Sequence, residues 1–421
     1  MAKSERIEKA YAIAKEMYAE VGIDADKALE NLKAISISMH CWQGDDIRGF
    51  EIRDSSVLAG NTITGNYPGR ARNIDEFRAD LEKVLTFVPG SHRLALHAIY
   101  LDAPKRIDRD QIAPEHFKSW MEWSRAKGIA LDMNQTYFDH PKANDGLTLT
   151  HPDPAIRKFW IDHSKAVRRI SAAFGANQGS PSTCNLWIQD GLKDSPADRM
   201  SFRTRLVESL DATFAEKIDP GHMLDAVEPK LFGIGTESFV PGSHEFYLGY
   251  AQSRKVMMTY DNGHFHPTEG IADKLSSYFL FNEKLLLHVT RGIRWDSDHV
   301  LTLGDDVIEI AKELVRGGFL GRTFIGTDFF DASINRIAAW TLGVRSMQKA
   351  MLIAFLEPVK RMREAEKSLD YTSRLVFMEE QKSLPWTAVW DCFCLRNNVP
   401  VGDEWLKEAK RYEADVLFKR G

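Results

Sequence analysis

The chain alternates short apolar runs with longer amphipathic stretches. Eight of the runs are rich in β-branched and other apolar residues, and most are bounded by polar or Gly/Pro turns, which is typical of buried strands. The runs are ISISMHCW (35–42), RLALHAIY (93–100), IALDMN (129–134), TCNLWIQD (183–190), MLDAVEPK (223–230), VMMTYDNGH (256–264), LLLHVTRGIRW (285–295) and FIGTDFFD (324–331).

The segments between these runs predict helices. DEFRADLEKVLTF (75–87), PAIRKFWIDHSKAVRRISAAF (154–174) and DDVIEIAKELVRGG (305–318) repeat apolar residues at steps of three and four, with charges between them. Eight strands that alternate with helices predict an α/β fold, a TIM (β/α)₈ barrel. The main alternative is a doubly wound open sheet, but no G-x-G-x-x-G follows the first run.

Helical patterns also flank the predicted barrel. The first twenty residues place Ile7, Tyr11, Ala14 and Met17/Tyr18 on one helical face, which indicates an amphipathic helix and not a signal peptide. From about residue 337 the pattern is helical to the end. We therefore expect a catalytic barrel with N-terminal helices over 1–336 and a helical extension over 337–421 that contacts other subunits of a homo-oligomer.

Composition narrows the class of partner. The 421 residues are 43% hydrophobic and 27% charged, with a net charge of −5 and no block of Lys or Arg. This balance argues against a nucleic-acid or membrane partner and favours a small ligand. The four cysteines are too scattered for a disulfide framework, so we expect reduced thiols in a cytoplasmic protein.

Polar residues close the predicted strands, whose C-terminal ends meet at one mouth of a barrel. An Asp-x-Asp alone is more often a solvated turn, but carboxylates on four consecutive strands would repel one another unless cations neutralised them. The first four strands offer His40 and Trp42, His97, Asp132 and Asn134, and Trp187 and Asp190. The last four offer Glu228 and Lys230, Asp261, His264 and His266, His288, Asp296 and Asp298, and Asp328 and Asp331. Such an oxygen-rich set with imidazole favours Mn²⁺, Co²⁺ or Mg²⁺ over a Cys/His zinc site.

Several stretches are long enough to identify a family. The chain closely resembles bacterial L-rhamnose isomerases from about residue 6 to its end. The stretches are SMHCWQGDD (38–46), ITGNYPGRARN (63–73), LHAIYL (96–101), DAVEPKLFGIGTESF (225–239), GHFHPTE (263–269), RWDSDHV (294–300), DFFDASINRIAAW (328–340) and EEQKSLPW (379–386). The ligand spacing is more distantly similar to that of D-xylose isomerase.

The resemblance implies two metal sites in each subunit. It implies a structural site made of Glu228, Asp261, His288 and Asp328, and a catalytic site made of His264, Asp296 and Asp298, with Asp261 bridging the two ions. Mn²⁺ is the first expectation, with Co²⁺, Mg²⁺ or Zn²⁺ as alternatives. We prefer Asp328 to Asp331 because Asp328 ends the strand, and we expect Asp331 to cap the helix that follows.

The resemblance also implies roles around the substrate. Lys230 would hydrogen-bond the sugar's carbonyl oxygen, with a salt bridge to a neighbouring acid as the structural alternative. His97 would act in ring opening near O5, although a core histidine is the alternative. Trp42, Trp187 and Phe138 would line the substrate pocket, or serve only as buried aromatics, and the loop 64–70 could close over the mouth.

The implied reaction interconverts L-rhamnose and L-rhamnulose, either by a metal-assisted 1,2-hydride shift or by proton transfer through a cis-enediol. The family further implies a homotetramer. Another aldose as substrate is one alternative. A metal-dependent barrel endonuclease is a second, which the net charge of −5 disfavours, and a non-catalytic sugar-binding protein is a third. His266 could support His264 or Asp261, and the sequence does not decide between them.

Overall fold

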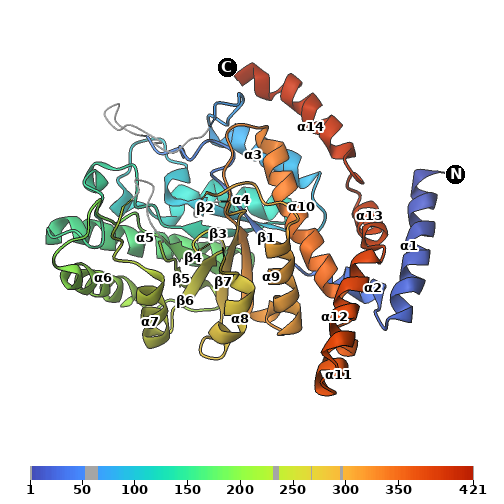
Figure 1. The fold of residues 1–421 in the computed structure, drawn as a ribbon. Coiled ribbons are helices and arrows are strands. Elements are labelled where there is room, and N and C mark those ends of the chain that lie inside the picture. Colours follow the sequence, from blue (N-terminus) through green and yellow to red (C-terminus); the bar gives the residue numbers. More distant parts are fainter. Residues whose placement is uncertain (1, 53–64, 231–236, 267, 294–296, 421) are drawn as a thin grey trace.

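The computed structural model describes residues 2–52, 65–230, 237–266, 268–293 and 297–420. Within them, eight parallel strands form a closed barrel in the order of the sequence (Figure 1). The strands are β1 Ile37–His40, β2 Arg93–His97, β3 Ala130–Asn134, β4 Ser182–Leu186, β5 Met223–Val227, β6 Met257–Asp261, β7 Leu285–Val289 and β8 Thr323–Thr327. Each lies within or almost wholly within one of the eight apolar runs, so the predicted TIM barrel is confirmed.

The strands are buried because helices cover them outside and side chains fill the barrel inside. All residues of β6 and β7 are buried, and such strands therefore lack an exposed polar face. Their register aligns the C-terminal ends: His97 pairs with Asn134 between β2 and β3, and Asp261 pairs with His288 between β6 and β7. Polar residues that end different strands are thus brought to one level of the barrel.

One helix follows each strand and packs on the outside. These helices are α3 Ile74–Leu85, α4 Lys118–Lys127, α5 Pro154–Gln178, α6 Arg199–Phe214, α7 His244–Arg254, α8 Ile271–Phe279, α9 Asp305–Arg316 and α10 Arg336–Phe355. The longest, α5, has local signals at both ends. The Asp153 side chain accepts a hydrogen bond from the Ala155 N–H, Pro154 opens the first turn, and Gly179 ends the helix at a φ of 69°.

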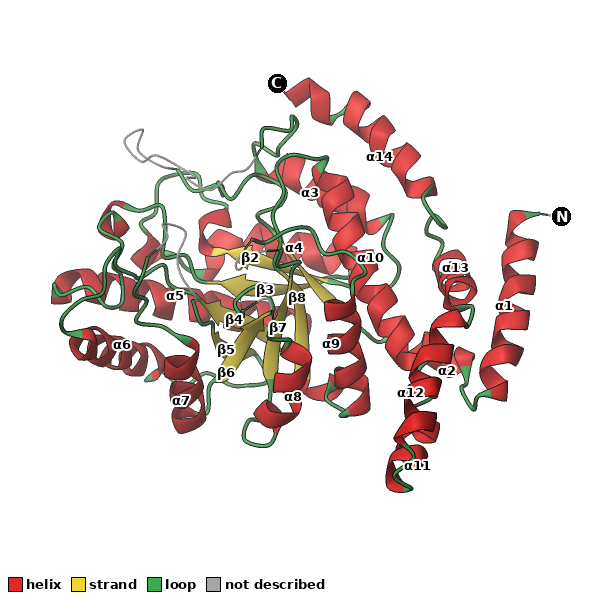
Figure 2. Cartoon of the chain, viewed as in Figure 1, coloured by secondary structure: helices red, strands yellow, loops and turns green. Residues whose placement is uncertain are grey.

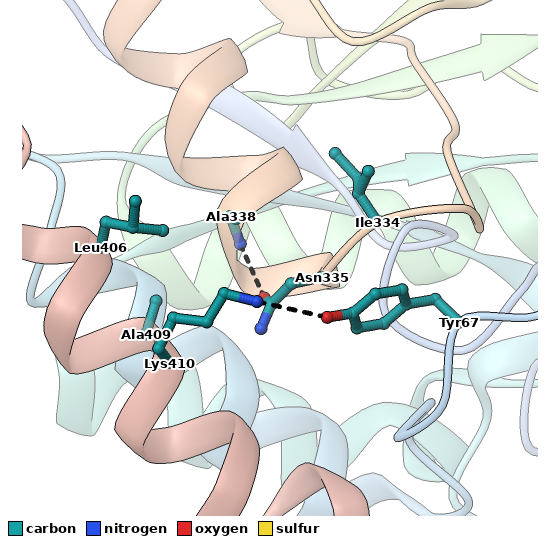
Figure 3. Close-up of a pocket in the computed structure, with 7 residues that line it drawn as sticks. All are labelled: Tyr67, Ile334, Asn335, Ala338, Leu406, Ala409 and Lys410. Carbon is teal, nitrogen blue, oxygen red and sulfur yellow. Dashed lines mark hydrogen bonds between the residues drawn. The ribbon is translucent and has the colours of Figure 1, made fainter.

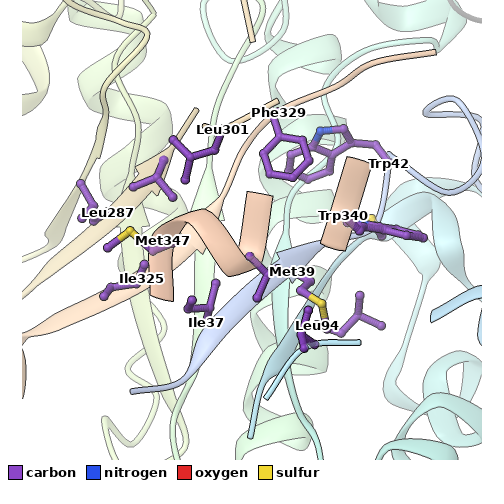
Figure 4. Close-up of a cluster of buried hydrophobic side chains, with 14 of the residues drawn as sticks. Ile37, Met39, Trp42, Leu94, Leu287, Leu301, Ile325, Phe329, Trp340 and Met347 are labelled. Atoms are coloured by element: carbon purple, nitrogen blue, oxygen red, sulfur yellow. The ribbon is translucent and has the colours of Figure 1, made fainter. Parts of the chain in front are cut away.

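The helix after β8 shares a core with the first strand. α10 packs on α9 and on β1, and Figure 4 shows its Trp340 and Met347 beside Ile37 and Met39 of β1. All four side chains are fully buried. The division into a domain over 1–336 and an extension over 337–421 stays a prediction.

Helices from both ends of the chain lie outside the barrel, on the side of α10 (Figure 2). They are α1 Lys3–Glu20, α2 Ala25–Lys33, α11 Val359–Lys367, α12 Tyr371–Glu380, α13 Trp386–Arg396 and α14 Glu404–Asp415. α1 packs on α13. It buries Ile7, Tyr11, Ala14 and Tyr18, as its periodicity predicts, while Met17 is 37% exposed.

α14 borders a small cavity that none of the predicted metal ligands lines. The cavity measures about 280 Å³ and lies between α14 and the start of α10 (Figure 3). Its lining is Tyr67, Ile334, Asn335, Ala338, Leu406, Ala409 and Lys410. Tyr67 donates a hydrogen bond to Glu413 at 2.6 Å, and its backbone N–H donates to Ala332 at 2.7 Å. Part of the loop 64–70 is thereby held against α14, and its role as a lid stays a prediction.

All four cysteines are buried and free of disulfides. Among the helices of the described segments, none combines the length and the apolar character that a membrane crossing requires.

Candidate metal centre and substrate pocket

Four predicted ligands meet at the C-terminal ends of β5 to β8. Glu228 and Asp328 directly follow β5 and β8, Asp261 ends β6, and His288 lies in β7. One ligand atom from each lies within 4.8 Å of the others. His288 Nδ1 lies 3.0 Å from Asp328 Oδ2 and 3.3 Å from Glu228 Oε1. The structure thus brings together the four residues of the implied structural metal site.

The electrostatics of this cluster fit a cation. Burial, reinforced by the Asp328 and Glu228 charges, raises the pKa of Asp261 well above its usual value. Burial alone would lower the pKa of His288, but Glu228 and Asp328 raise it well above its usual value. Asp261 Oδ1 accepts from the Gly263 N–H at 2.6 Å, whereas its buried Oδ2 has no partner among the described residues. Three carboxylates and one imidazole suit a hard divalent ion, which would displace the protons held there.

The residues implied for the second ion are described only in part. His264 Nδ1 lies 3.8 Å from Glu228 Oε1, beside the cluster. Asp298 is half-buried, and its backbone carbonyl accepts from the Phe330 N–H at 2.8 Å, so it lies near the end of β8. Asp296 lies outside the described residues. The second metal site therefore stays a prediction.

Aromatic side chains lie at or beyond the C-terminal ends of β1 to β4. The His97 ring lies 5.3 Å from that of Trp42 and 5.5 Å from that of Phe138, both edge-on. Phe138 in turn lies 6.4 Å from Trp187, and Lys230 Nζ lies 5.5 Å from the centroid of the Trp187 ring. The five predicted residues therefore form one continuous row, which runs from Trp42 to Lys230, two residues beyond Glu228.

Lys230 is buried and paired. Its Nζ donates to the backbone carbonyl of Gln189 and to Glu237 Oε1, the latter at 3.2 Å. The side chain is 2% exposed, so the ammonium lies within the protein. The salt bridge that we considered as the structural alternative is present, and it also fixes the ammonium over Trp187.

A hydrogen-bonded chain behind the aromatic row holds His97 in place. The Thr136 hydroxyl lies 2.9 Å from His97 Nδ1, and the Thr136 N–H donates to His163 Nε2 at 3.1 Å. His163 Nδ1 donates to the Arg109 carbonyl at 2.9 Å, and the Arg109 guanidinium donates to the Phe138 carbonyl at 2.5 Å. Burial lowers the pKa of His97 to about 3, and the Arg109 charge also lowers it. His97 is therefore neutral at pH 7.

His163 gives a prediction about stability and pH. Burial lowers its pKa from 6.5 to about 3, so its contribution to stability is complete above pH 6.5 and is lost as the pH falls toward 3. Between pH 7.5 and 4.5 wild type should lose about 3 kcal/mol through this residue. His163→Asn lacks that loss, so the gap in unfolding free energy between the two proteins, measured in urea, should narrow by this amount. A gap independent of pH would contradict the assignment of a neutral His163.

One sequence expectation is wrong, and some of the other polar residues noted in the sequence pair within the scaffold. Asp331 does not cap the helix: α10 begins at Arg336, and its N-cap is Asn335, which accepts from the Ala338 N–H. Asp331 Oδ1 instead accepts from the Ser333 N–H at 2.7 Å, closing a local turn that precedes the helix. Asp132 pairs with Arg93 at 2.7 Å. His266 Nδ1 lies 2.7 Å from the Thr268 hydroxyl.

Sequence reasoning missed Asn185. This residue lies within β4 and donates from Nδ2 to Glu228 Oε2 at 2.6 Å. One signal in the sequence was available: Asn185 is a polar amide between apolar residues in TCNLW (183–187), near the end of a predicted strand. Its partner, Glu228 at the end of the neighbouring strand β5, could not be read from the sequence.

Comparisons with known proteins identify close relatives. The family described as L-rhamnose isomerase (RhaA) matches residues 5–420. A protein named L-rhamnose isomerase from Salmonella gallinarum (strain 287/91 / NCTC 13346) is 55% identical over 415 residues, 99% of each chain. One of the same name from Salmonella agona (strain SL483) is also 55% identical over 99% of each chain. Among solved structures, a D-allulose 3-epimerase from Methylomonas sp. covers 83% of this chain and 98% of its own, with 13% identity and a TM-score of 0.47.

Proposed function

The chain belongs to the L-rhamnose isomerase family, and on that premise we propose that it interconverts L-rhamnose and L-rhamnulose with two divalent cations held at the β5–β8 end of its barrel. The observation that carries the proposal is the largely buried cluster of Glu228, Asp261, His288 and Asp328. Metal ligands beside a sugar pocket suit a metal-assisted isomerisation, and the aromatic row would supply the pocket wall.

The metal ligands divide as the family pattern implies. Glu228, Asp261, His288 and Asp328 would hold one ion. His264, Asp296 and Asp298 would hold the second, with Asp261 shared. When bound, the cations would supply Lewis acidity at the sugar oxygens O1 and O2. We place Mn²⁺ first because the ligands are mostly carboxylate oxygens with one imidazole for each ion.

The chain's own residues bind and orient the sugar. The Lys230 ammonium, held over Trp187, donates a hydrogen bond to the sugar's carbonyl oxygen, where negative charge develops. The Thr136 hydroxyl at Nδ1 leaves His97 Nε2 to exchange a proton with O5 during ring opening. Trp42, Phe138 and Trp187 cover the apolar faces of the sugar and exclude water.

Two routes move hydrogen between C1 and C2. A 1,2-hydride shift needs no residue to take a proton from carbon, whereas a cis-enediol route needs a base within hydrogen-bond reach. We favour the shift. L-Rhamnose deuterated at C2 should give product that keeps the deuterium at C1, and complete washout into water would establish the enediol route instead.

A substrate panel tests the proposed reaction. With saturating Mn²⁺, ketose formation should be fastest on L-rhamnose, slower on L-mannose, which differs by a hydroxyl at C6, and slowest on D-xylose. If another aldose were turned over faster, that aldose and not L-rhamnose would be assigned as the substrate. Absence of ketose from all three sugars, in a folded protein that binds Mn²⁺, would refute the function.

Asp296→Asn tests the second ion. The neutral amide is a poorer ligand than the carboxylate, so bound Mn²⁺ should fall from two to about one per chain while the fold persists. Asp305→Asn, at an exposed position at the start of α9, should still bind two ions. Metal analysis after gel filtration gives the count. An Asp296→Asn protein with two tightly bound ions and full activity would refute the assignment.

We further propose a cytoplasmic homotetramer. α12 buries none of its ten residues, and Leu369, Tyr371, Leu375 and Val376 on and beside it are each about half exposed or more, which suits a subunit contact. The buried free thiols fit a reducing compartment. Light scattering should give four times the chain mass of 47.8 kDa, and a monomeric mass would refute the assembly.

A further inference from the structure

We propose that Asn185 and Thr259 form a two-step hydrogen-bond relay that positions Glu228 and so sets the affinity of the metal centre. The inference rests on the proposed function, because it concerns the same ion. Neither residue offers a ligand atom to the cluster. Both are positioning residues that act through Glu228.

The relay runs across three strands at one level of the barrel. Asn185 of β4 donates from Nδ2 to Glu228 Oε2 at 2.6 Å, and Thr259 of β6 donates from its hydroxyl to Asn185 Oδ1 at 2.7 Å. Asn185 is 4% exposed, Glu228 3% and Thr259 fully buried. Water therefore competes little for these hydrogen bonds, and the lower dielectric strengthens them.

The direction of each hydrogen bond fixes the relay. The Glu228 carboxylate can only accept, so the amide must present its NH₂ group to Oε2. The carbonyl of the amide then faces the Thr259 hydroxyl, which must donate. Removing that hydroxyl would leave Asn185 Oδ1 buried without a partner and free the amide to rotate. Thr259 thus fixes the orientation of the Asn185 amide, and that amide in turn holds the Glu228 carboxylate.

The relay also selects which oxygen of Glu228 faces the other ligand side chains and would therefore be available to an ion. Oε2 is taken by Asn185, whereas Oε1 lies 3.3 Å from His288 Nδ1 and 3.8 Å from His264 Nδ1, within the ligand cluster. A fixed carboxylate loses little rotational entropy when the ion binds. Because the amide is neutral, it achieves this without adding a fourth negative charge to three crowded carboxylates.

The backbone around the relay is held independently of it. The Asn185 carbonyl accepts from the Gln135 N–H at 3.0 Å, and the Glu228 N–H donates to the Leu186 carbonyl at 2.9 Å. β4 and β5 also pair along their whole length, from Ser182 and Met223 to Leu186 and Val227. A substitution of either side chain should therefore leave the strands in register and change the position of the Glu228 carboxylate.

Thr259→Val and Thr259→Ser provide the matched test. Each full-length, chelator-stripped protein is titrated with Mn²⁺ by calorimetry, and the dissociation constant of the tighter site is compared with wild type. Losing a residue that hydrogen-bonds to a metal ligand, without itself touching the metal, typically costs about 10- to 100-fold in metal affinity. Thr259→Val, which keeps shape but loses the hydroxyl, should weaken binding about tenfold. Thr259→Ser, which keeps the hydroxyl, should stay within about threefold.

Asn185→Ala completes a double-mutant cycle. Alone it should weaken Mn²⁺ binding by about 10- to 100-fold, and adding Thr259→Val should weaken it little further, because Thr259 acts through the amide that is already absent. If Asn185→Ala does not fold, the Val and Ser variants at position 259 decide alone.

The outcomes separate the inference from the function on which it rests. Wild type that binds Mn²⁺, with Thr259→Val folded and binding equally well, would overturn the relay and leave the proposed function intact. Equal weakening by Thr259→Val and Thr259→Ser would also overturn it, since shape and not the hydroxyl would then matter. Wild type that binds no Mn²⁺ would overturn both.

Discussion

Asp328→Asn is expected to lower the rate of ketose formation from L-rhamnose by at least about a thousandfold, because it removes a charged ligand from the buried cluster. Asp328 Oδ2 lies 3.0 Å from His288 Nδ1, and the Asp328 side chain is 21% exposed at the mouth. An amide there cannot balance the charge of a divalent ion. Metal analysis should therefore show less Mn²⁺ bound per chain, and steady-state kinetics should show the loss mainly in kcat.

Asp331→Asn is the matched control for this substitution. Asp331 stands three residues further along the same loop, and its Oδ1 accepts from the Ser333 N–H, which an asparagine oxygen can do equally well. Activity and metal content should stay within about twofold of wild type. If Asp331→Asn were the inactive variant and Asp328→Asn the active one, the ligand would be Asp331.

Lys230→Met is expected to lower kcat by roughly 10²- to 10³-fold while the metal content stays at the wild-type level. The ammonium supplies a charged donor to the developing oxyanion, and methionine retains its bulk over Trp187 without the charge. A purely structural lysine would behave differently. Its loss would lower stability, by leaving the partly buried Glu237 without its cationic partner, and leave the kcat of the folded fraction unchanged.

Glu237→Gln separates these two roles. It breaks the 3.2 Å ion pair with Lys230 but retains the ammonium, which still donates to the Gln189 carbonyl. Its kcat should fall by less than about tenfold even if its stability falls as far as that of Lys230→Met. Equal losses of kcat in the two variants, measured at saturating L-rhamnose and Mn²⁺, would show that the ion pair matters and not the ammonium.

The barrel could be predicted from the sequence because its strands are buried on both faces. LLLHV (285–289) and MMTYD (257–261) appear as largely apolar runs with a polar ligand at or next to the end, and both form strands over those residues. Strand ends in a closed parallel barrel must converge, so placing Glu228, Asp261 and Asp328 together followed from topology alone. No distance was needed for that prediction.

The contacts behind the site could not be predicted, because they depend on strand register and side-chain direction, which no local sequence pattern gives. Asn185 meets Glu228 from the neighbouring strand, and Lys230 meets Glu237 seven residues along the chain. Neither pairing has a periodic signal. The helix start after β8 was misplaced for a local reason, because DASIN (331–335) contains two possible N-cap residues, Asp331 and Asn335. Asp331 accepts from the Ser333 N–H in a turn before the helix, so Asn335 caps the helix instead.

A titration of Mn²⁺ into chelator-stripped protein, with bound metal and ketose formation from L-rhamnose measured on the same samples, tests the central claim most directly. The cluster at β5 to β8 predicts no turnover without metal and a rate that rises with occupancy until two ions are bound per chain. Full turnover by the metal-free protein, or saturated metal without any turnover, would contradict the account.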